Sequence, residues 1–290
     1  MTKIPANISF SGGETSAYMT QWLLKNKTKD YDFIVTFANT GQELEETLEF
    51  VDKCDKYFGF NLTWVEALPQ ARGIGTKHNV VNFQTASRSG LPFKSVIQKY
   101  GIPNMAFKHC SRELKARPID SYTKEYFGHN KYETFIGIRA DEIDRITETP
   151  RLNYPLVDLG ITKAHINSFW SEQPFRLKIK GYEGNCMTCW KKSKRKLLTI
   201  AKEHPERFNF MREMEQKYEN YLPSGKNPEK YLLPARFFRG KQTVEDLLKE
   251  AQQPFKVAED DKFIFLSEDL DLEGECGSES CEIYQFELEL

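Results

Sequence analysis

The sequence lacks the features that would place it in several common classes. No apolar run approaches the ~20 residues that span a bilayer, and no secretory signal opens the chain. Basic and acidic residues almost cancel, to a formal net charge of −1, so any contact with nucleic acid needs a local basic patch. There is no internal repeat and no low-complexity segment. We therefore expect a cytoplasmic protein without a membrane span, folded as one large domain or two smaller ones.

Cysteine is also scarce, but its placement is informative. The six cysteines are Cys54, Cys110, Cys186, Cys189, Cys276 and Cys281. In a reducing compartment, two cysteines separated by two residues more often bind a metal or do redox chemistry than form a structural disulfide. Cys186 and Cys189 have this spacing at a glycine turn before a helical segment, which is typical of half of a metal or cluster site. A buried, reduced pair is the simpler alternative.

Strands alternate with helices in the first half of the chain, which predicts an α/β fold with a doubly wound, mainly parallel sheet. The predicted strands are Ile4–Phe10, Phe33–Phe37, Leu62–Glu66 and Tyr132–Ile138, and the predicted helices are Ser16–Lys27, Glu43–Tyr57, Phe93–Lys99 and Pro118–Phe127. The rest of residues 69–107 is expected to be a long loop, because glycine and proline interrupt it.

Thr162 is the predicted N-cap of a helix that ends at Trp170, and the regular alternation stops beyond that helix. Three further helices are predicted at Trp190–His204, Arg207–Tyr218 and Thr243–Ala251. We therefore expect an α/β domain over residues 1–158, a mostly helical, cysteine-containing extension over 159–258, and an acidic tail over 259–290.

The first strand runs through a serine- and glycine-rich turn into a helix. Gly12 and Gly13 allow backbone N–H groups to approach a ligand closely, and Ser11, Thr15 and Ser16 add hydroxyl groups. The positive end of the helix dipole favours an anion at the turn, so we predict a phosphate-binding loop. The spacing is not that of a Walker loop. A turn whose glycines serve geometry alone is the alternative.

Four ordered segments within about residues 4–200 resemble the PP-loop ATP pyrophosphatases, and in particular their phosphoadenylyl-sulfate (PAPS) reductase-like branch. Ser9–Ser16 resembles the SGGxxS phosphate loop, and Asn39–Glu43 resembles the nucleoside turn. His109–Pro118 is similar to the cysteine and lysine segment, and Gly137–Glu142 to the G-[LI]-R-x-[DE]-[EQ] segment. The resemblance implies an adenine nucleotide alpha-hydrolase-like fold that binds ATP or a related adenine nucleotide.

The resemblance also implies roles for individual residues. The implied nucleotide-binding residues are Ser9, Ser11, Gly12, Gly13, Thr15, Ser16, Asn39, Thr40, Gly41, Gly137, Arg139 and Arg145. Lys115 is a catalytic cation, and Asp141 or Glu142 is a ligand for Mg²⁺. For residues 139–142 the alternative is a solvated loop with a surface ion pair. Thr15 stands where adenylating members carry Asp, and Thr is a poor Mg²⁺ ligand.

By the same resemblance, Cys110 joins Cys186 and Cys189 around a [4Fe–4S] cluster or Zn²⁺. The fourth ligand is left open among Cys281, Cys276, His109 and no protein residue. Glu275-Cys276-Gly277 also resembles the end of sulfonucleotide reductases, where a tail cysteine attacks the substrate. Here the surrounding glutamates would raise the thiol pKa.

Three functions are compatible with this pattern. Nucleic-acid thiolation by adenylation is favoured, because Lys191–Lys196 places five cations in six residues, a candidate contact for RNA or DNA. A solvated helix face is the alternative for that run. The second function is a sulfonucleotide reductase that uses the tail cysteine. The third is a non-catalytic nucleotide-binding module with a structural zinc. Homo-oligomerisation is left open.

Overall fold

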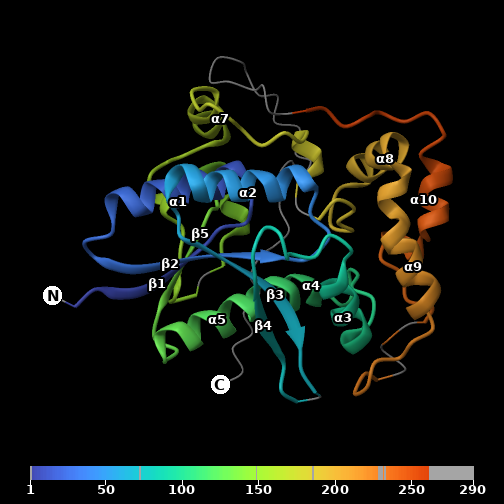
Figure 1. The fold of residues 1–290 in the computed structure, drawn as a ribbon. Helices are drawn as coiled ribbons and strands as arrows, with labels where there is room; N and C mark the ends of the chain where they lie inside the picture. The colour runs from blue at the N-terminus through green and yellow to red at the C-terminus, as the bar shows by residue number, and fades with distance from the viewer. Residues whose placement is uncertain are drawn as a thin grey trace.

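A six-stranded sheet forms the centre of the protein, with strand order β4-β3-β2-β1-β5-β6 (Figure 1). The computed structural model describes residues 2–71, 73–147, 149–184, 186–227, 231 and 233–260. The strands are β1 (Ile4–Ser9), β2 (Tyr31–Asn39), β3 (Leu62–Pro69), β4 (Thr76–Val81), β5 (Glu133–Ile136) and β6 (Leu152–Asn153). All neighbouring strands are parallel except β3 and β4. The predicted α/β fold with a mainly parallel sheet is confirmed.

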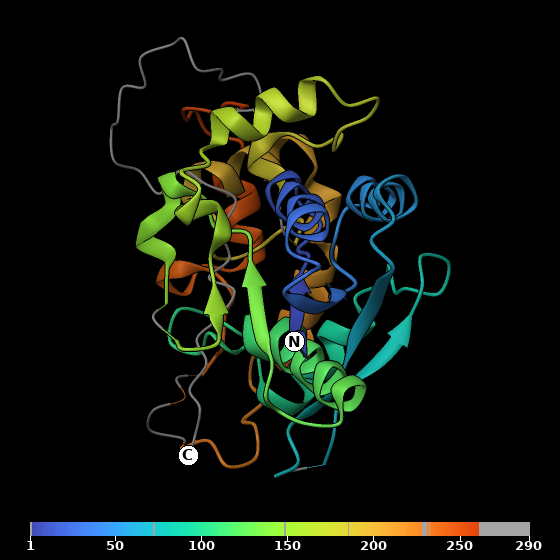
Figure 2. The same cartoon turned by 90° about the vertical axis from the view of Figure 1, so that its left-hand side faces the viewer.

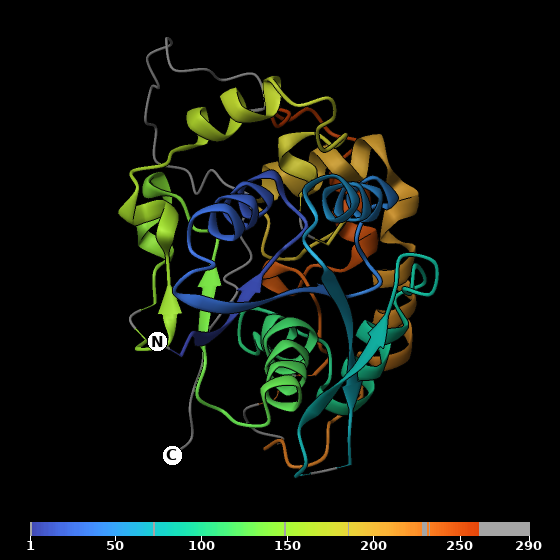
Figure 3. The same cartoon turned by 60° about the vertical axis from the view of Figure 1, so that its left-hand side comes forward.

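Helices cover both faces of this sheet. Helices α1 (Glu14–Asn26) and α2 (Glu45–Phe58) lie on one face, with α7 (Lys163–Ser171) outside α1, and α5 (Arg117–Phe127) lies on the other face (Figures 1 and 3). The remaining helices are α3 (Leu91–Tyr100), α4 (His109–Ser111), η1 (Arg112–Ala116), η2 (Ala140–Arg145), α6 (Pro155–Asp158), η3 (Gly181–Glu183), α8 (Lys194–Glu203), η4 (Pro205–Phe208), α9 (Asn209–Tyr218), η5 (Arg239–Lys241) and α10 (Val244–Glu250).

The parallel strands bring distant polar segments to one edge of the sheet. Ile8 in β1 is fully buried. Strands β1, β2 and β5 end at Ser9, Asn39 and Ile136, respectively. Because the carboxyl ends of parallel strands lie at the same edge, the loops that follow these strands meet there. This edge is where ligands bind in open α/β sheets, and it holds most of the predicted site residues.

Two local expectations were wrong. Thr76–Val81 is a strand, β4, inside the stretch predicted to be a loop. Its residues Lys77, His78 and Asn79 are polar and lie on an edge strand, so the apolar run of a buried strand is missing. The basic helix begins at Lys194 rather than Trp190, because Ser193 caps it by accepting a hydrogen bond from Lys196 N.

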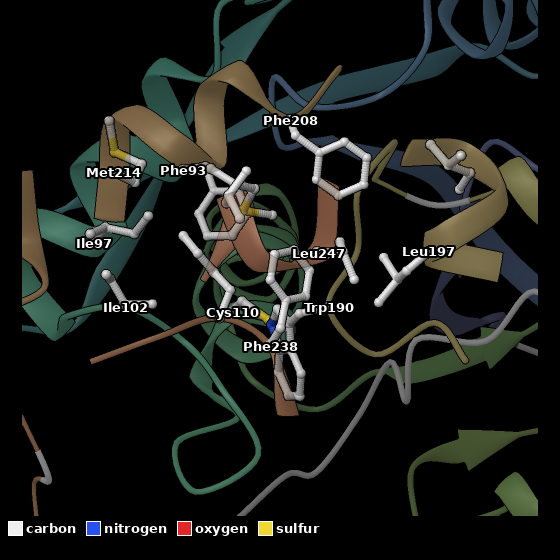
Figure 4. Close-up of a cluster of buried hydrophobic side chains, with 14 of the residues drawn as sticks. Phe93, Ile97, Ile102, Cys110, Trp190, Leu197, Phe208, Met214, Phe238 and Leu247 are labelled. Atoms are coloured by element: carbon white, nitrogen blue, oxygen red, sulfur yellow. The ribbon is translucent and has the colours of Figure 1, made fainter. Parts of the chain in front are cut away.

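The described helices of the C-terminal region share a hydrophobic core with the middle of the chain. Helices α8, α9 and α10 lie side by side at one end of the sheet (Figure 1). Their apolar residues pack with α3 and with Cys110 in one buried cluster (Figure 4). A second cluster lies between the sheet and the helices α1, α2 and α7.

Candidate functional site

The loop between β1 and α1 is held closed by its own serines. Ser11 N donates to Ser16 Oγ at 3.1 Å, and the Ser11 and Ser16 hydroxyl oxygens are 2.9 Å apart. Ser16 Oγ in turn donates to Gly13 O at 3.0 Å. Helix α1 therefore begins at Glu14, directly behind the two glycines. This arrangement presents the start of a thirteen-residue helix at the carboxyl edge of the sheet, where an anion is favoured.

Two glycines in this region are required by close packing. Gly12 has a φ of +84°, and a Cβ there would lie 3.0 Å from the Phe37 ring and 3.1 Å from Thr47. A Cβ on Gly137, after β5, would lie 3.0 Å from Ser16 Cα, which belongs to backbone that cannot easily move. The loop therefore sits tightly between the ends of β2 and β5.

Arg139 connects the β5 loop to the phosphate loop. Its Nη1 donates to Thr15 Oγ1 at 3.1 Å, and its Nε donates to Asp141 Oδ1 at 2.9 Å. Glu142 lies between two arginines, 3.3 Å from Arg139 Nη1 and 2.5 Å from Arg145 Nη1. Arg139 and Glu142 are only 4% and 3% exposed, so this is a buried network and not a solvated surface pair. Both predicted Mg²⁺ ligands are thus engaged by Arg139.

The turn after β2 is fixed by a buried carboxylate that the sequence interpretation did not select. Glu43 accepts hydrogen bonds from Thr40 N at 2.9 Å, from Thr40 Oγ1 at 2.9 Å and from Gln42 N at 3.2 Å. Gly41 has a φ of +77°, and a Cβ there would lie 2.9 Å from the Gly90 backbone. The turn is therefore shaped in advance by its own side chain and by the loop before α3.

A second carboxylate outside the predicted set supports the same turn. Glu66, the β3 residue that pairs with Asn39 of β2, accepts from Asn39 Nδ2 and from Ser87 N, each at 2.6 Å. Asn39 Nδ2 also donates to Ser87 O at 2.9 Å. The side chain of Asn39 is therefore used in holding the loop at Ser87 against β2. The only sequence signal for Glu66 was its position as the last residue of a predicted strand.

The Cys-x-x-Cys loop packs directly against this turn. Cys186 Sγ lies 3.4 Å from Thr40 Oγ1, and Met187 N donates to Gln42 O at 2.8 Å. Cys186 and Cys189 are both buried and contact each other. Between and after them, Thr188 Oγ1 and Trp190 Nε1 are buried without a hydrogen-bond partner among the described residues. The structure thus brings a thiol pair to the predicted nucleoside turn.

Cys110 and Lys115 lie on a neighbouring segment of unusual geometry. Residues Arg112–Ala116 form a π-helix, a conformation that is rare and is often found at functional sites. Cys110 and Trp190 belong to the same buried cluster, and Figure 4 shows their side chains close together. Lys191 Nζ donates to Ser111 Oγ at 3.3 Å. The two predicted cysteine segments therefore adjoin.

Burial and neighbouring groups shift the pKa values of His109 and Glu113, which lie close to Cys110 in the sequence. Burial lowers the pKa of His109 to about 4, and the nearby Lys226 and Arg112 act in the same direction. His109 is therefore neutral at pH 7, and its Nε2 lies 3.1 Å from Gly101 O. For Glu113, burial raises the pKa, but hydrogen bonds from Thr76 and Arg112 outweigh this and lower it below the usual value. Glu113 thus stays ionised although it is buried.

Within the described residues, the predicted metal ligands are not gathered into one group. Among the described residues, no three His, Cys, Asp or Glu side chains are grouped so that they could hold a metal ion. Cys110, Cys186 and Cys189 are buried and lie on adjoining segments. Cys276 and Cys281 lie outside the described residues, so their predicted roles concern a part of the chain that the structure does not describe.

The basic run Lys191–Lys196 is partly engaged with the protein itself. Lys192 Nζ donates to the carbonyl oxygens of Tyr182, at 3.1 Å, and Gly184. Lys194 Nζ lies 2.7 Å from Glu250 Oε1 on α10. Lys191 and Lys192 also precede α8. The run is therefore not one continuous face of a helix, and at least part of its charge supports the fold.

The fold and the loops at the carboxyl edge of the sheet define an α/β protein of a nucleotide-binding class. Residues 5–155 match the phosphoadenosine phosphosulfate reductase domain family, which is more than half of the 290-residue chain. The chain belongs to this family, a member of the PP-loop ATP pyrophosphatase superfamily. The family resemblance predicted from the four segments is confirmed.

Similar proteins are themselves described as uncharacterized. One is a nin region protein of Escherichia phage lambda, 35% identical over 204 residues, which are 68% of this chain and 69% of that protein. Two proteins of Methanocaldococcus jannaschii are 27% identical over 213 residues and 25% identical over 232 residues. These alignments cover 70% and 74% of this chain but only 46% and 43% of the archaeal proteins, so this chain spans less than half of their length.

In the part of the chain that the structure describes, no helix has both the length and the apolar character needed to cross a membrane.

Proposed function

We propose that this protein is an enzyme that binds ATP or a closely related adenine nucleotide and uses it in sulfur chemistry. The phosphates bind at Ser11–Ser16, where backbone N–H groups and hydroxyls meet the start of α1. The nucleoside binds at Asn39–Gly41. Arg139, hydrogen-bonded to Thr15, supplies a forked cation beside the phosphate loop, and Lys115 and Arg145 are the further cations of the site.

The observation that carries this proposal is the contact of the thiol pair with the nucleoside turn. Cys186 Sγ lies 3.4 Å from Thr40 Oγ1, within the turn that follows β2. Delivering sulfur to an adenylated substrate needs a thiol that carries an extra sulfur atom as a persulfide and displaces AMP, and reducing an activated sulfate needs a thiolate that attacks its sulfur and displaces the nucleotide. The contact of Cys186 with the turn therefore supports a site where sulfur chemistry and nucleotide binding adjoin.

Two reactions remain within this proposal. The first is adenylation of a substrate oxygen followed by sulfur delivery, with a nucleic acid contacted by Lys191–Lys196 as the acceptor. The second is reduction of a sulfonucleotide, with Cys276 of the tail as the nucleophile. Thr15 favours the second, because a hydroxyl is a weaker Mg²⁺ ligand than a carboxylate. The engagement of Lys192 and Lys194 in protein contacts also weakens the support for the first.

An iron–sulfur cluster or zinc at Cys110, Cys186 and Cys189 belongs to the proposal, but the described residues are not arranged to receive it. We therefore derive no chemical step through a metal. Thr188 Oγ1 and Trp190 Nε1, which are buried and have no hydrogen-bond partner in the described part of the chain, lie in the right segment to donate hydrogen bonds to a sulfur-containing group. Anaerobic purification with metal analysis and an absorption spectrum decides the matter: iron with visible absorption supports a cluster, and a single tightly held zinc in a colourless protein excludes one.

Nucleotide binding is tested by a pair of isosteric variants at Gly13. A Cβ at this position has only Ser11 Oγ nearby, at 3.9 Å, and the N-cap Gly13 makes no side-chain capping bond. Asp and Asn are equally good caps, so Gly13→Asp and Gly13→Asn should both fold at least as stably as the wild type. Only Gly13→Asp places a negative charge at the phosphate site.

We expect ATP to stabilise the wild type and Gly13→Asn against heat but not Gly13→Asp. At a ligand concentration of 100 Kd the expected stabilisation is about 2.7 kcal/mol. If neither ATP, AMP nor a phosphosulfate nucleotide stabilises the wild type, the proposal is wrong. Release of AMP and pyrophosphate identifies adenylation, release of sulfite identifies reduction, and binding without either product supports the non-catalytic alternative.

A further inference from the structure

A segment outside the family's matching region contacts both loops of the phosphate site. The match ends at residue 155, and the segment in question is residues 161–177, which contains α7. At its beginning, Ala140 N donates to Ile161 O at 2.8 Å, and Lys163 N donates to Asp141 Oδ2 at 3.3 Å. Its first residues therefore hold the loop that carries Arg139.

The end of the same segment holds the first residue of α1. Trp170 Nε1 donates to Glu14 O at 3.0 Å. Arg176 forms a fork on the Glu14 carboxylate, with Nε to Oε1 and Nη2 to Oε2 both at 3.0 Å, and Leu177 N donates to Oε1 at 3.2 Å. Figure 2 shows α7 lying across the outer side of α1. The segment thus spans from one side of the site to the other.

The contact between Arg176 and Glu14 is electrostatic as well as steric, because Glu14 carries a buried charge. Its side chain is 5% exposed, and the residue directly follows Gly13 in the phosphate loop. A carboxylate buried beside an anion site opposes the binding of a second negative charge, because the local dielectric is low. Arg176 is the cation that pairs with Glu14 in a bidentate arrangement, which is the strongest and best-oriented form of ion pair.

We infer that residues 161–177 are a clamp on the phosphate loop, and that Arg176 is its positioning residue, which fixes the start of α1 by neutralising the buried Glu14. The effect on anion affinity rests on the proposed function. The effect on the loop itself does not, because it concerns the unliganded protein. Arg176 touches no part of the phosphate loop except Glu14 in the contacts described above, so it acts through that residue.

The chain offers a matched control in the next helix. Glu45 is the first residue of α2, and Arg88 forms the same fork on it, with Nε and Nη2 each 3.0 Å from a carboxylate oxygen. Glu45 is half-exposed, whereas Glu14 is buried. Arg88→Gln therefore removes a similar ion pair, together with the bonds that Arg88 Nη1 donates to Phe83 O and Ala86 O, without touching the phosphate loop.

The first measurement is amide hydrogen exchange in the unliganded protein. Arg176→Gln should speed exchange at Ser11 and Ala17, whose N–H groups bond to Ser16 Oγ and Gly13 O, by about tenfold or more. Arg88→Gln should leave both amides unchanged. The double variant Glu14→Gln/Arg176→Gln should exchange more slowly than Arg176→Gln, because no uncompensated charge is left buried. Unchanged exchange at both amides in Arg176→Gln overturns the clamp.

The second measurement is calorimetric titration with pyrophosphate and with ATP. Arg176→Gln should bind both about tenfold more weakly, while Arg176→Lys, which keeps the charge, and the double variant should both bind within about threefold of the wild type. If the double variant exchanges its amides as fast as Arg176→Gln and binds both ligands as weakly, Arg176 has only a structural role, and the proposal that it acts by neutralising Glu14 is wrong. If the wild type binds neither ligand, the proposed function fails, and hydrogen exchange alone still decides the clamp. Should Arg176→Gln not fold, Arg176→Lys against the double variant provides the same comparison.

Discussion

Gly12 shows how a single residue fixes the phosphate loop. Its φ of +84° is one that side chains other than glycine rarely adopt, and a Cβ would lie within 3.2 Å of Phe37, Thr47 and Val51. A left-handed conformation costs a non-glycine residue about 1–2 kcal/mol, and forcing an extra carbon into a packed site costs about 1–3 kcal/mol more. Gly12 therefore carries two separate constraints.

We predict that Gly12→Ala lowers the free energy of unfolding by about 2–5 kcal/mol. Gly128→Ala is the matched control, because Gly128 has a φ of +72° but no atom within 4 Å of its would-be Cβ. The control should lose about 1 kcal/mol from strain alone. Urea denaturation of both variants measures the difference. Equal losses would show that packing around Gly12 does not matter.

Site residues that lie in short sequence motifs could be predicted from the sequence, and residues that act through distant contacts could not. Gly12, Thr15 and Arg139 lie in short motifs, and the structure does bring Arg139 to Thr15. Glu14 and Arg176 are 162 positions apart, and nothing near either one marks them as partners. Contacts of this kind depend on where α7 packs, which no local pattern determines.

Strand β4 illustrates the same limit for whole elements. Its sequence predicts a loop, because it is polar and preceded by Gly73 and Gly75, yet it pairs antiparallel with β3 and packs on α5. His78 on β4 makes this packing specific. Its Nδ1 lies 2.9 Å from Ser121 Oγ, its ring packs edge-on against Tyr122, and its Nε2 lies 3.7 Å from Glu125. The π-helix Arg112–Ala116 likewise has no pattern of its own in the sequence.

The pairing of β4 with α5 should depend on pH through His78. Burial lowers the pKa of His78 below its ordinary value of 6.5, Glu125 opposes this, and Lys77 adds to it. The folded state therefore favours the neutral ring. The stabilisation from His78 is present above pH 6.5 and is lost as the pH falls through the lowered, folded-state pKa.

We predict that the wild type loses more stability than His78→Gln when the pH falls from about 7.5 to about 5.5. Glutamine keeps a group that can bond to Ser121 but has no proton to take up in this range. Urea denaturation at both pH values, followed by tryptophan fluorescence, measures the loss of stability of the wild type and of His78→Gln. Equal losses would exclude His78 as a source of pH dependence.

At the scale of the whole molecule, the C-terminal helices share one hydrophobic core with the α/β part. The α/β class and its helical extension could be predicted, because alternation of strands and helices is a property of consecutive residues. The shared core could not, because it joins residues 93–114 with residues 182–258. Phe93, Ile97 and Ile102 pack there with Phe208 and with residues of α9 and α10 (Figure 4).

The last prediction concerns the fragment of residues 1–158, the expected α/β domain. That fragment lacks the C-terminal side chains that pack on four apolar residues, Phe93, Val96, Ile97 and Ile102. Each of the four is at most 2% exposed in the whole chain. Each buried side chain of this size contributes about 2 kcal/mol, so the loss of roughly 8 kcal/mol is comparable to the whole stability of a typical domain. We expect the fragment to aggregate or to bind a hydrophobic dye, and to regain cooperative unfolding when residues 159–290 are supplied as a second chain. A monomeric 1–158 fragment with its own cooperative transition would contradict this, and would mean that the α/β part does not need the helices to fold.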